Sequence, residues 1–558
     1  MRKWVQRAGK MVLPTLCFLL AWAFLNVLVN LNYPAQEPHR LALLLPSPEV
    51  AVLLTALCAA VWLRMPFHPA VYFPLTALLI FFRLFRIGDV LMPMYFNRAF
   101  NLYIDSKYVP DLMHLLYYTV SLEAFIGYIG LGVALFTAVV WGVWRSFKTI
   151  HYYLAVRRQR HVFVGLTSVL LGLSLFLHPG QTDERSGVFA KGFFHRVVEE
   201  FDFILHVHGY RTQNLNAIRL ASTNADQAPT SLDKLRGANV YVFFVESYGH
   251  TVFTDPRHFS MIAPVFESFE QGLEAHGFAV YSNFLTSPTY GGTSWLAHGT
   301  LASGVKLPNQ MRYNLLVTSK VKTIAHYFNK AGYRTVSAMP GTTWPWPEGA
   351  FFGYQKKYYA WHFDYKGPSY GWSPMPDQYV LDYVNRQEIQ QRTKPLFIEF
   401  VLVSSHAPFH RQPPYLEDWS QVGDGSIFHE KEIITFPIVW PDLSNAAEAY
   451  ITSIIYEVKV LKAHLEQHIK DDALIIILGD HQPNVQITGE NRPWSVPIHI
   501  ISRNRYFLEP FAARGYTPGI IPRQPLPHPG METFLYNLIE DFSKAPAKEI
   551  TQQYAQGF

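Results

Sequence analysis

Cysteine is almost absent from the 558-residue sequence, which contains only Cys17 and Cys58. Both lie in apolar stretches near the N-terminus, so the rest of the chain has no disulfide and no thiol chemistry. Charged residues are also scarce, at 16% against 49% hydrophobic residues, which is too apolar for an ordinary soluble multidomain protein. The net charge of +5 comes with no basic and aromatic recognition motif, so no nucleic-acid partner is expected.

Long hydrophobic runs explain the apolar composition, and they are concentrated in the first third of the chain. Each is close to the roughly 20 residues that cross the hydrocarbon core of a bilayer. Five membrane-spanning helices are predicted, at residues 11–31, 41–63, 68–86, 120–144 and 161–178. A cleaved signal peptide is the alternative for the first run, but this run is longer than the usual ~7–15 apolar residues and further spans follow. A retained anchor is therefore expected.

Basic residues indicate the orientation of these spans. Lys and Arg cluster at positions 2–10, before the first span, and at positions 145–160, between the fourth and the fifth. Both segments are expected in the cytoplasm, so a protein of the bacterial inner membrane, with a periplasmic or otherwise extracytoplasmic domain after five spans, is predicted. The predicted divisions are a membrane domain over 1–180, a connector over 181–236, a catalytic domain over 237–545 and a tail over 546–558.

Beyond residue 237, short apolar runs alternate with helical stretches such as 447–468. Strands are predicted at 239–245, 333–339, 395–403, 473–478 and 496–502. This alternation favours an α/β domain with a mostly parallel, doubly wound sheet.

Three of the predicted strands run into residues that could bind a metal. The first ends at Glu246 in "NVYVFFVES", the third leads to His406, and the fourth leads to Asp480 and His481. Strand ends that are far apart in the sequence can meet at one edge of a parallel sheet. Two carboxylates and an imidazole suit Zn²⁺ or Mn²⁺ better than Ca²⁺ or Mg²⁺. Glu246, Asp480 and His481 are therefore candidate ligands of one divalent metal, although an Asp-His pair can also be an ordinary turn.

A hydroxyl-rich segment, "NFLTSPTYGGTSWLAHGTLASG" over 283–304, lies between these strand ends in the sequence. Two glycines followed by Thr293 and Ser294 predict a tight turn that opens a helix, where a hydroxyl can serve only as the cap. Beside a divalent ion the same hydroxyl can be a nucleophile, because the metal stabilises its alkoxide form, and the helix amide groups can bind the oxyanions of a phosphoryl group.

The motifs "NVYVFFVES", "GGTSWLAHGTLASG", "VSSHAPF" and "LGDHQP", together with the apolar N-terminal third, resemble the lipoteichoic acid synthase and phosphoethanolamine transferase branch of the alkaline phosphatase/sulfatase superfamily. The resemblance implies a sulfatase-like catalytic domain with one divalent metal. It implies Thr293 as nucleophile and additional metal ligand, and His406 as the contact to the substrate phosphate. Counting back from "ASG", as in sulfatases, places the nucleophile at Ser294 instead.

Departures from the family pattern bear on the substrate. The segment "TSWLAH" lacks the Cys, Pro and Arg of the sulfatase signature, which disfavours sulfate-ester hydrolysis. The family's phosphoglycerol-binding stretch offers Trp344 or Trp346 here, with Trp346 as the predicted substrate contact, but Pro340 and Glu348 stand near the expected His and Arg positions. The implied headgroup is therefore phosphoglycerol or phosphoethanolamine.

The expected reaction is transfer of this headgroup from a membrane phospholipid donor to an envelope glycan or lipid acceptor, through a phospho-threonine. A phosphodiesterase or phosphatase with the same site is one alternative. A catalytically inactive lipid-binding protein that has kept the fold is another. No sequence pattern specifies an oligomeric state.

Overall fold

The computed structural model describes residues 2–31, 43, 46–64, 69–110, 113, 117, 122–156, 159–161, 163–164, 194–227, 230–438 and 442–544. The chain forms two compact units, Met1–Met94 with Arg98–Val207, and Tyr95–Asn97 with His208–Phe558. Among the described residues the first unit is helical, and the strands belong to the second. The predicted tail, 546–558, lies outside the described residues.

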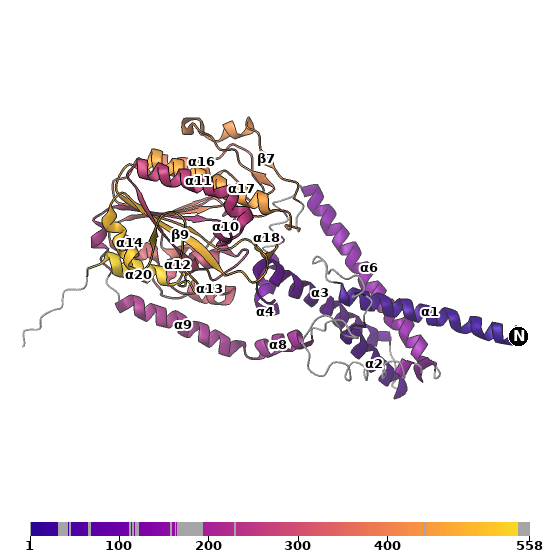
Figure 1. Ribbon diagram of the computed structural model, residues 1–558. Helices are drawn as coiled ribbons and strands as arrows, with labels where there is room; N and C mark the ends of the chain where they lie inside the picture. Colours follow the sequence, from indigo (N-terminus) through magenta and orange to yellow (C-terminus); the bar gives the residue numbers. More distant parts are fainter. Residues whose placement is uncertain are drawn as a thin grey trace, which may run out of the picture. The chain divides into compact units, whose positions relative to one another are not determined.

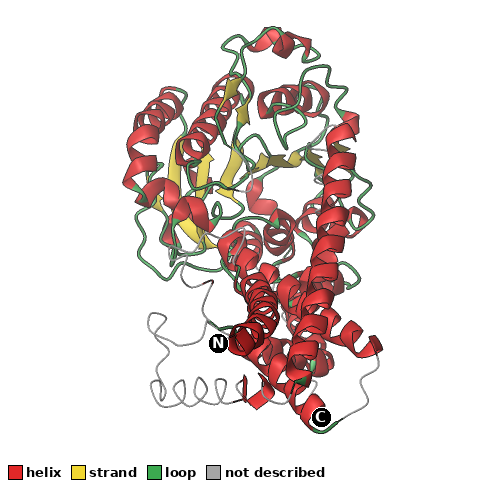
Figure 2. Cartoon of the chain, turned by 90° about the vertical axis from the view of Figure 1, so that its right-hand side faces the viewer, coloured by secondary structure: helices red, strands yellow, loops and turns green. Residues whose placement is uncertain are grey.

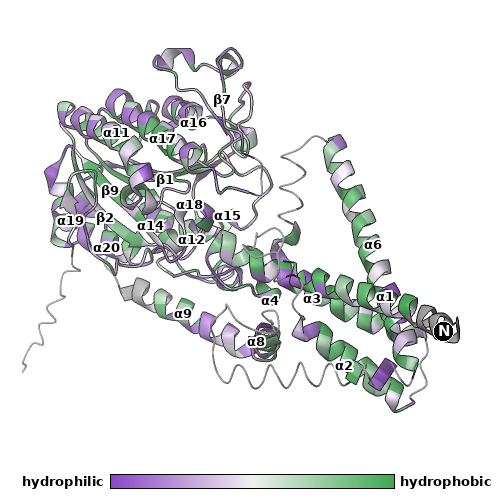
Figure 3. Ribbon diagram, turned by 45° about the vertical axis from the view of Figure 1, so that its right-hand side comes forward, coloured by the Kyte–Doolittle hydropathy of each residue, from purple (hydrophilic) through white to green (hydrophobic). Residues whose placement is uncertain are grey.

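The helices of the first unit are α1 (Arg2–Asn30), α2 (Pro48–Trp62), most of α3 (Tyr72–Phe96), α4 (Leu102–Asp105), α6 (Leu122–Ala155) and α8 (Phe194–Leu205). The four longest of its N-terminal helices, α1, α2, α3 and α6, share an apolar core that includes Leu25, Leu79 and Phe147. Apolar residues run along all four helices (Figure 3). The first half of α6 also exposes apolar side chains such as Leu131 and Leu135, which is typical of a helix surface that meets lipid.

The described part of the chain has two candidate membrane spans, not the five that the sequence predicts. They are Val12–Asn30 and Leu122–Ala155. Within the described residues of the run 41–63, the α-helix is the 15-residue α2, which is short for a bilayer. Helix α3 carries two arginines and an aspartate, and charges are costly in the hydrocarbon core. The fifth predicted span, 161–178, lies almost entirely outside the described residues.

An eight-stranded sheet forms the centre of the second unit, in the order β10-β2-β9-β8-β1-β5-β3-β4. Its strands are β1 (Asn239–Val245), β2 (Ala279–Thr286), β3 (Arg334–Met339), β4 (Lys356–Tyr359), β5 (Leu396–Leu402), β8 (Ala473–Gly479), β9 (Ser495–Ser502) and β10 (Thr517–Pro518). The strands from β8 to β4 in this order are parallel, whereas β9, β2 and β10 join by antiparallel pairing. The prediction of a mostly parallel α/β sheet is confirmed, with the correction that the sheet is mixed.

Helices cover both faces of the sheet (Figures 1 and 2). The longer helices on one face are α11 (Pro256–Ala275), α16 (Asp377–Val384) and α17 (Ala447–His468). Those on the other face are α12 (Ser294–Ser303), α14 (Ile324–Lys330) and α20 (Thr533–Phe542). Successive side chains of β1 point to opposite faces, because a strand has a period of two. Residues 241, 243 and 245 therefore join the core with α11, α16 and α17, and residues 240, 242 and 244 join the core with α12, α14 and α20.

Glu399 places a carboxyl group inside the sheet. It lies in β5, is buried, and its Oε2 accepts a hydrogen bond of 2.7 Å from the Tyr354 hydroxyl. Burial raises the pKa of Glu399 from 4.5 to about 7. Because the folded-state pKa is the higher one, the protonated form stabilises the fold below about pH 4.5, and this stabilisation is lost as the pH rises through about 7.

Glu399→Gln is expected to remove the loss of stability above about pH 7, because the amide has the shape of the protonated acid and does not ionise. At pH 8 the variant should be more stable than the native chain by about 3 kcal/mol, and near pH 4.5 the two should unfold alike. Thermal unfolding of the purified chain over this pH range measures the difference. The matched control is Glu509→Gln, at an exposed helix position. A stability difference between Glu399→Gln and the native chain that is the same at both pH values would contradict the assignment.

Candidate active site

The carboxyl ends of three neighbouring strands bring the predicted site residues to one edge of the sheet. Glu246 follows β1, His406 lies on the loop after β5, and Asp480 and His481 follow β8. The ligand atoms of Glu246, Asp480 and His481 all lie within 4.8 Å of one another. These three side chains are 4%, 1% and 1% exposed, so they form one buried cluster, which we call the ligand cluster.

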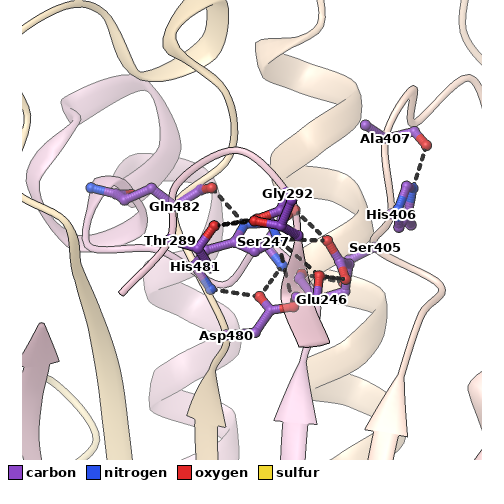
Figure 4. Close-up of polar contacts among 12 residues, drawn as sticks. Glu246, Ser247, Thr289, Gly292, Ser405, His406, Ala407, Asp480, His481 and Gln482 are labelled. Carbon is purple, nitrogen blue, oxygen red and sulfur yellow. Dashed lines mark hydrogen bonds and ion pairs between the residues drawn. The ribbon is translucent and has the colours of Figure 1, made fainter. Parts of the chain in front are cut away.

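Backbone contacts fix the direction of each group in the ligand cluster (Figure 4). Asp480 Oδ1 accepts hydrogen bonds from the backbone N–H groups of Ser247, at 2.8 Å, and His481, at 2.6 Å. His481 Nδ1 lies 2.7 Å from the carbonyl oxygen of Gln482. Its Nε2 therefore faces the carboxylates, 3.2 Å from Glu246 Oε1 and 3.7 Å from Asp480 Oδ2. Such outer contacts orient metal ligands in proteins.

The charges of the ligand cluster are strongly coupled. Burial, and then the charge of Glu246, raise the pKa of Asp480 to about 8. Burial opposes protonation of His481, but Asp480 and Glu246 outweigh it and raise the pKa of His481 to about 9. Burial also opposes ionisation of Glu246, yet the charges of His406 and His481 hold the pKa of Glu246 well below its usual range. Two carboxylates this close need a compensating positive charge, and a divalent cation fits the two oxygens and one nitrogen presented here.

Ser294 adds a hydroxyl group to the ligand cluster. Its Oγ donates a hydrogen bond of 2.9 Å to Glu246 Oε2 and lies 3.0 Å from His481 Nε2. Ser294 is also the first residue of α12. The first backbone N–H groups of a helix have no partner within it and attract oxyanions. A buried-cluster hydroxyl and a helix end suited to bind an anion therefore coincide at this residue.

Thr293, the nucleophile predicted from the sequence, has other neighbours. Its Oγ1 lies 2.5 Å from Thr289 Oγ1 and 2.6 Å from the Gly292 carbonyl oxygen. Its φ of 59° is left-handed, which is strained for a β-branched residue. This backbone turn directs the two adjacent hydroxyls to different surroundings. The role of Thr293 stays a prediction, and the contacts favour Ser294.

His406 lies beside the ligand cluster rather than within it (Figure 4). Its half-buried ring stacks on Trp372, with 4.9 Å between ring centroids and 21° between planes, and its Nδ1 lies 2.6 Å from the Ala407 carbonyl oxygen. Its effect on the pKa of Glu246 shows that it is within electrostatic reach. A contact from His406 to a substrate phosphate stays a prediction. Trp372 was not anticipated, because no sequence spacing connects it with His406.

Trp346, the other predicted substrate contact, is half-buried and packs on Phe352, with 5.1 Å between ring centroids. Trp344 is 53% exposed. The binding of a headgroup by either tryptophan stays a prediction.

His298 lies beside the ligand cluster and was not singled out from the sequence. It lies on α12 four residues after Ser294, a spacing that places both side chains on one face of a helix. Its ring contacts Phe244 at 4.3 Å between centroids, and its Nε2 lies 4.0 Å from Asp480 Oδ2. Burial lowers the pKa of His298 to about 4, so the imidazole is neutral at pH 7. Its spacing of four residues from Ser294 is the sequence signal by which His298 could have been found.

The sulfatase family model matches residues 301–508, which include the end of α12 and the Asp480-His481 pair. This match confirms the sulfatase part of the resemblance drawn from the motifs, since residues 301–508 match a sulfatase domain. No curated protein matches the chain in sequence.

Similar solved structures include the following three. The integral membrane lipooligosaccharide phosphoethanolamine transferase A of Neisseria meningitidis is 10% identical, with 94% of this chain and 95% of that chain covered and a TM-score of 0.42. The lipoteichoic acid synthase LtaP of Listeria monocytogenes is 13% identical, with 54% and 76% covered and a TM-score of 0.35. The periplasmic domain of EptC from Escherichia coli, in complex with Zn, is 12% identical, with 51% and 75% covered and a TM-score of 0.34. These similarities assign no substrate or residue role to this chain.

Proposed function

We propose that the chain is a membrane-anchored phosphotransferase that moves a phospho-substituted headgroup, phosphoglycerol or phosphoethanolamine, from a phospholipid to an envelope glycan or lipid. The observation that carries this proposal is the Ser294 hydroxyl, which contacts Glu246 and His481 at the N-terminus of α12. A hydroxyl beside two candidate metal ligands and a helix end is suited to attack at phosphorus.

In the first half of the reaction the Ser294 oxygen forms a bond to phosphorus, and the bond between phosphorus and the diacylglycerol oxygen breaks. The hydroxyl proton leaves toward Glu246 Oε2, to which it is already directed. The N–H groups at the start of α12 bind the phosphoryl oxygens. His406 is proposed to hold a phosphate oxygen or to protonate the departing diacylglycerol oxygen, because it lies at the same edge of the sheet.

In the second half the oxygen of an acceptor hydroxyl forms a bond to phosphorus and its proton passes to the His406 imidazole, which gave one to diacylglycerol. The bond between phosphorus and the Ser294 oxygen breaks, and this oxygen takes back the proton that Glu246 accepted. Glu246, Asp480, His481 and Ser294 are proposed to hold one Zn²⁺ or Mn²⁺. Such a metal would neutralise charge on the transferring group and on the Ser294 oxygen. Dividing one difficult substitution into two easier ones is the general advantage of a covalent intermediate.

A lipid donor agrees with the helices of the first unit. Val12–Asn30 and Leu122–Ala155 are long and apolar enough to cross a membrane. We propose that they anchor the chain in the bacterial cytoplasmic membrane, with the basic residues at 2–10 and 145–160 in the cytoplasm. The sheet domain is proposed to lie on the extracytoplasmic side, which requires one more crossing, at the fifth predicted span, 161–178, almost all of which is outside the described residues.

The test uses the purified full chain in mixed micelles with phosphatidylglycerol or phosphatidylethanolamine labelled in the headgroup. Release of diacylglycerol with label retained on the protein, and transfer of that label to an added envelope-lipid extract, is the expected result. Release of free headgroup phosphate at the same rate with and without the extract would identify a hydrolase. No diacylglycerol from either lipid, with Zn²⁺ or Mn²⁺ present, would reject an enzyme that acts on these donors.

A further inference from the structure

A buried imidazole nitrogen lies beside the ligand cluster and takes no part in the proposed reaction. Nε2 of His298 is buried and has no hydrogen-bond partner. A buried polar atom in this state is unfavourable and uncommon in proteins. Asp480 Oδ2 lies 4.0 Å away, beyond the roughly 3.2 Å of an N–H···O bond, so a shift of about 1 Å would satisfy the nitrogen.

The surroundings of His298 direct its ring toward Asp480. On one side the ring packs against Phe244 of β1, with 4.3 Å between centroids. Ser294, one helical turn earlier on the same face of α12, contacts both Glu246 and His481. The imidazole is therefore held near the cluster by the same helix that places the nucleophile.

The geometry favours a positioning role for His298 over direct metal binding. Within the described residues, the group whose ligand atoms all lie within 4.8 Å of one another consists of Glu246, Asp480 and His481 and does not include His298. Asp480 Oδ1 is already fixed by the backbone N–H groups of Ser247 and His481, which leaves Oδ2 as the oxygen nearer to His298.

We propose that His298 donates a hydrogen bond from Nε2–H to Asp480 Oδ2 when Asp480 binds its metal, and that this bond orients the carboxylate and increases metal affinity. The proposal rests on the proposed function, since it requires Asp480 to be a metal ligand. Outer-shell donors of this kind typically contribute 10–100-fold to metal affinity.

Two substitutions separate the hydrogen bond from the packing of the ring. His298→Phe keeps an aromatic ring against Phe244 but has no N–H, whereas His298→Gln keeps an N–H at about the position of Nε2. With Zn²⁺ alone as the probe, His298→Phe should bind roughly 10–100-fold more weakly than the native full chain, and His298→Gln within a few-fold of it. The control is His464→Phe, since His464 is also buried with both ring nitrogens unpartnered, and it lies in α17 against Phe243. This control should keep native affinity.

Competition with a chromogenic chelator measures the Zn²⁺ affinity and stoichiometry of each chain, and thermal unfolding in EDTA measures the stability of each metal-free fold. Native affinity in all His298 variants would overturn the proposal. An equal but partial loss of affinity in His298→Phe and His298→Gln would also overturn it, because ring packing would then be the cause. If both variants lose bound zinc altogether, His298 is a direct ligand and the positioning role is wrong.

If His298→Phe does not fold, His298→Met replaces it in the comparison, because a flexible thioether fills the same space without an N–H. A native chain that binds no zinc or manganese would show that the proposed metal site itself is wrong. If instead the native chain binds zinc tightly and the His298 variants bind it equally tightly, only the role of His298 is overturned.

Discussion

Ser294→Ala is expected to lose headgroup transfer by roughly 10⁴-fold or more, the scale on which the loss of a covalent nucleophile acts. It should also lose the covalent phospho-adduct, because the hydroxyl that contacts Glu246 and His481 is gone. Thr293→Ala should keep most of the transfer and all of the adduct, since Thr293 Oγ1 contacts Thr289 and the Gly292 carbonyl instead. Peptide mass spectrometry after incubation with phospholipid locates the adduct, and diacylglycerol release gives the rate.

The two adjacent hydroxyls make this a sharp test. An adduct on Thr293, with full activity in Ser294→Ala, would reverse the assignment made from the contacts and support the assignment made from the family pattern. Full turnover by the double variant would exclude a covalent intermediate on either residue. Attack by water or by the acceptor itself would then be the remaining mechanism.

Asp480→Ala is expected to abolish metal binding. The affinity should fall by more than the roughly 10–100-fold that an outer partner contributes, because a direct ligand is lost. The metal content of the purified full chain, about one ion per chain in the native protein, should fall toward zero when measured by mass spectrometry of the metal. Activity should fall with it, because the metal would stabilise the charge of the transferring group.

Controls separate loss of the metal from loss of the fold. Asp480 Oδ1 accepts two backbone hydrogen bonds, so Asp480→Asn, which keeps one oxygen, is the milder variant for the comparison. The exposed Asp442 supplies a neutral reference, as Asp442→Ala should leave the metal content unchanged. Unchanged stoichiometry in a folded Asp480→Ala chain would remove Asp480 from the ligand set.

Much of the fold of the second unit could be predicted, because each central strand is a continuous buried run. The five predicted strands are present, and the polar residues that follow β1 and β8 meet in the ligand cluster. Strand β2 was not predicted, since "AVYSNFLT" has neither a continuous apolar run nor a clean alternation. Its antiparallel pairing with β9, and that of β9 with β8, could not be read from local sequence because pairing direction depends on distant partners.

The remaining errors have physical causes as well. Hydropathy of a run does not reveal where a helix stops, so 41–63 was overestimated as a span. Thr293 and Ser294 are adjacent, and the left-handed backbone that directs them apart is a property of the folded turn. His298 and Trp372 acquire their significance only through neighbours that are far away in the sequence.

The ligand cluster joins positions that are 233 residues apart, as the Ser247–Asp480 hydrogen bond shows. An ion held there would act as a reversible crosslink that closes a very long loop, and it would bind only the chain whose loop is already closed. The free energy of unfolding would then increase with the concentration of free metal, by about 4 kcal/mol at 1,000 times the dissociation constant. The supply of one trace element would in this way set how long the sheet domain survives proteolysis.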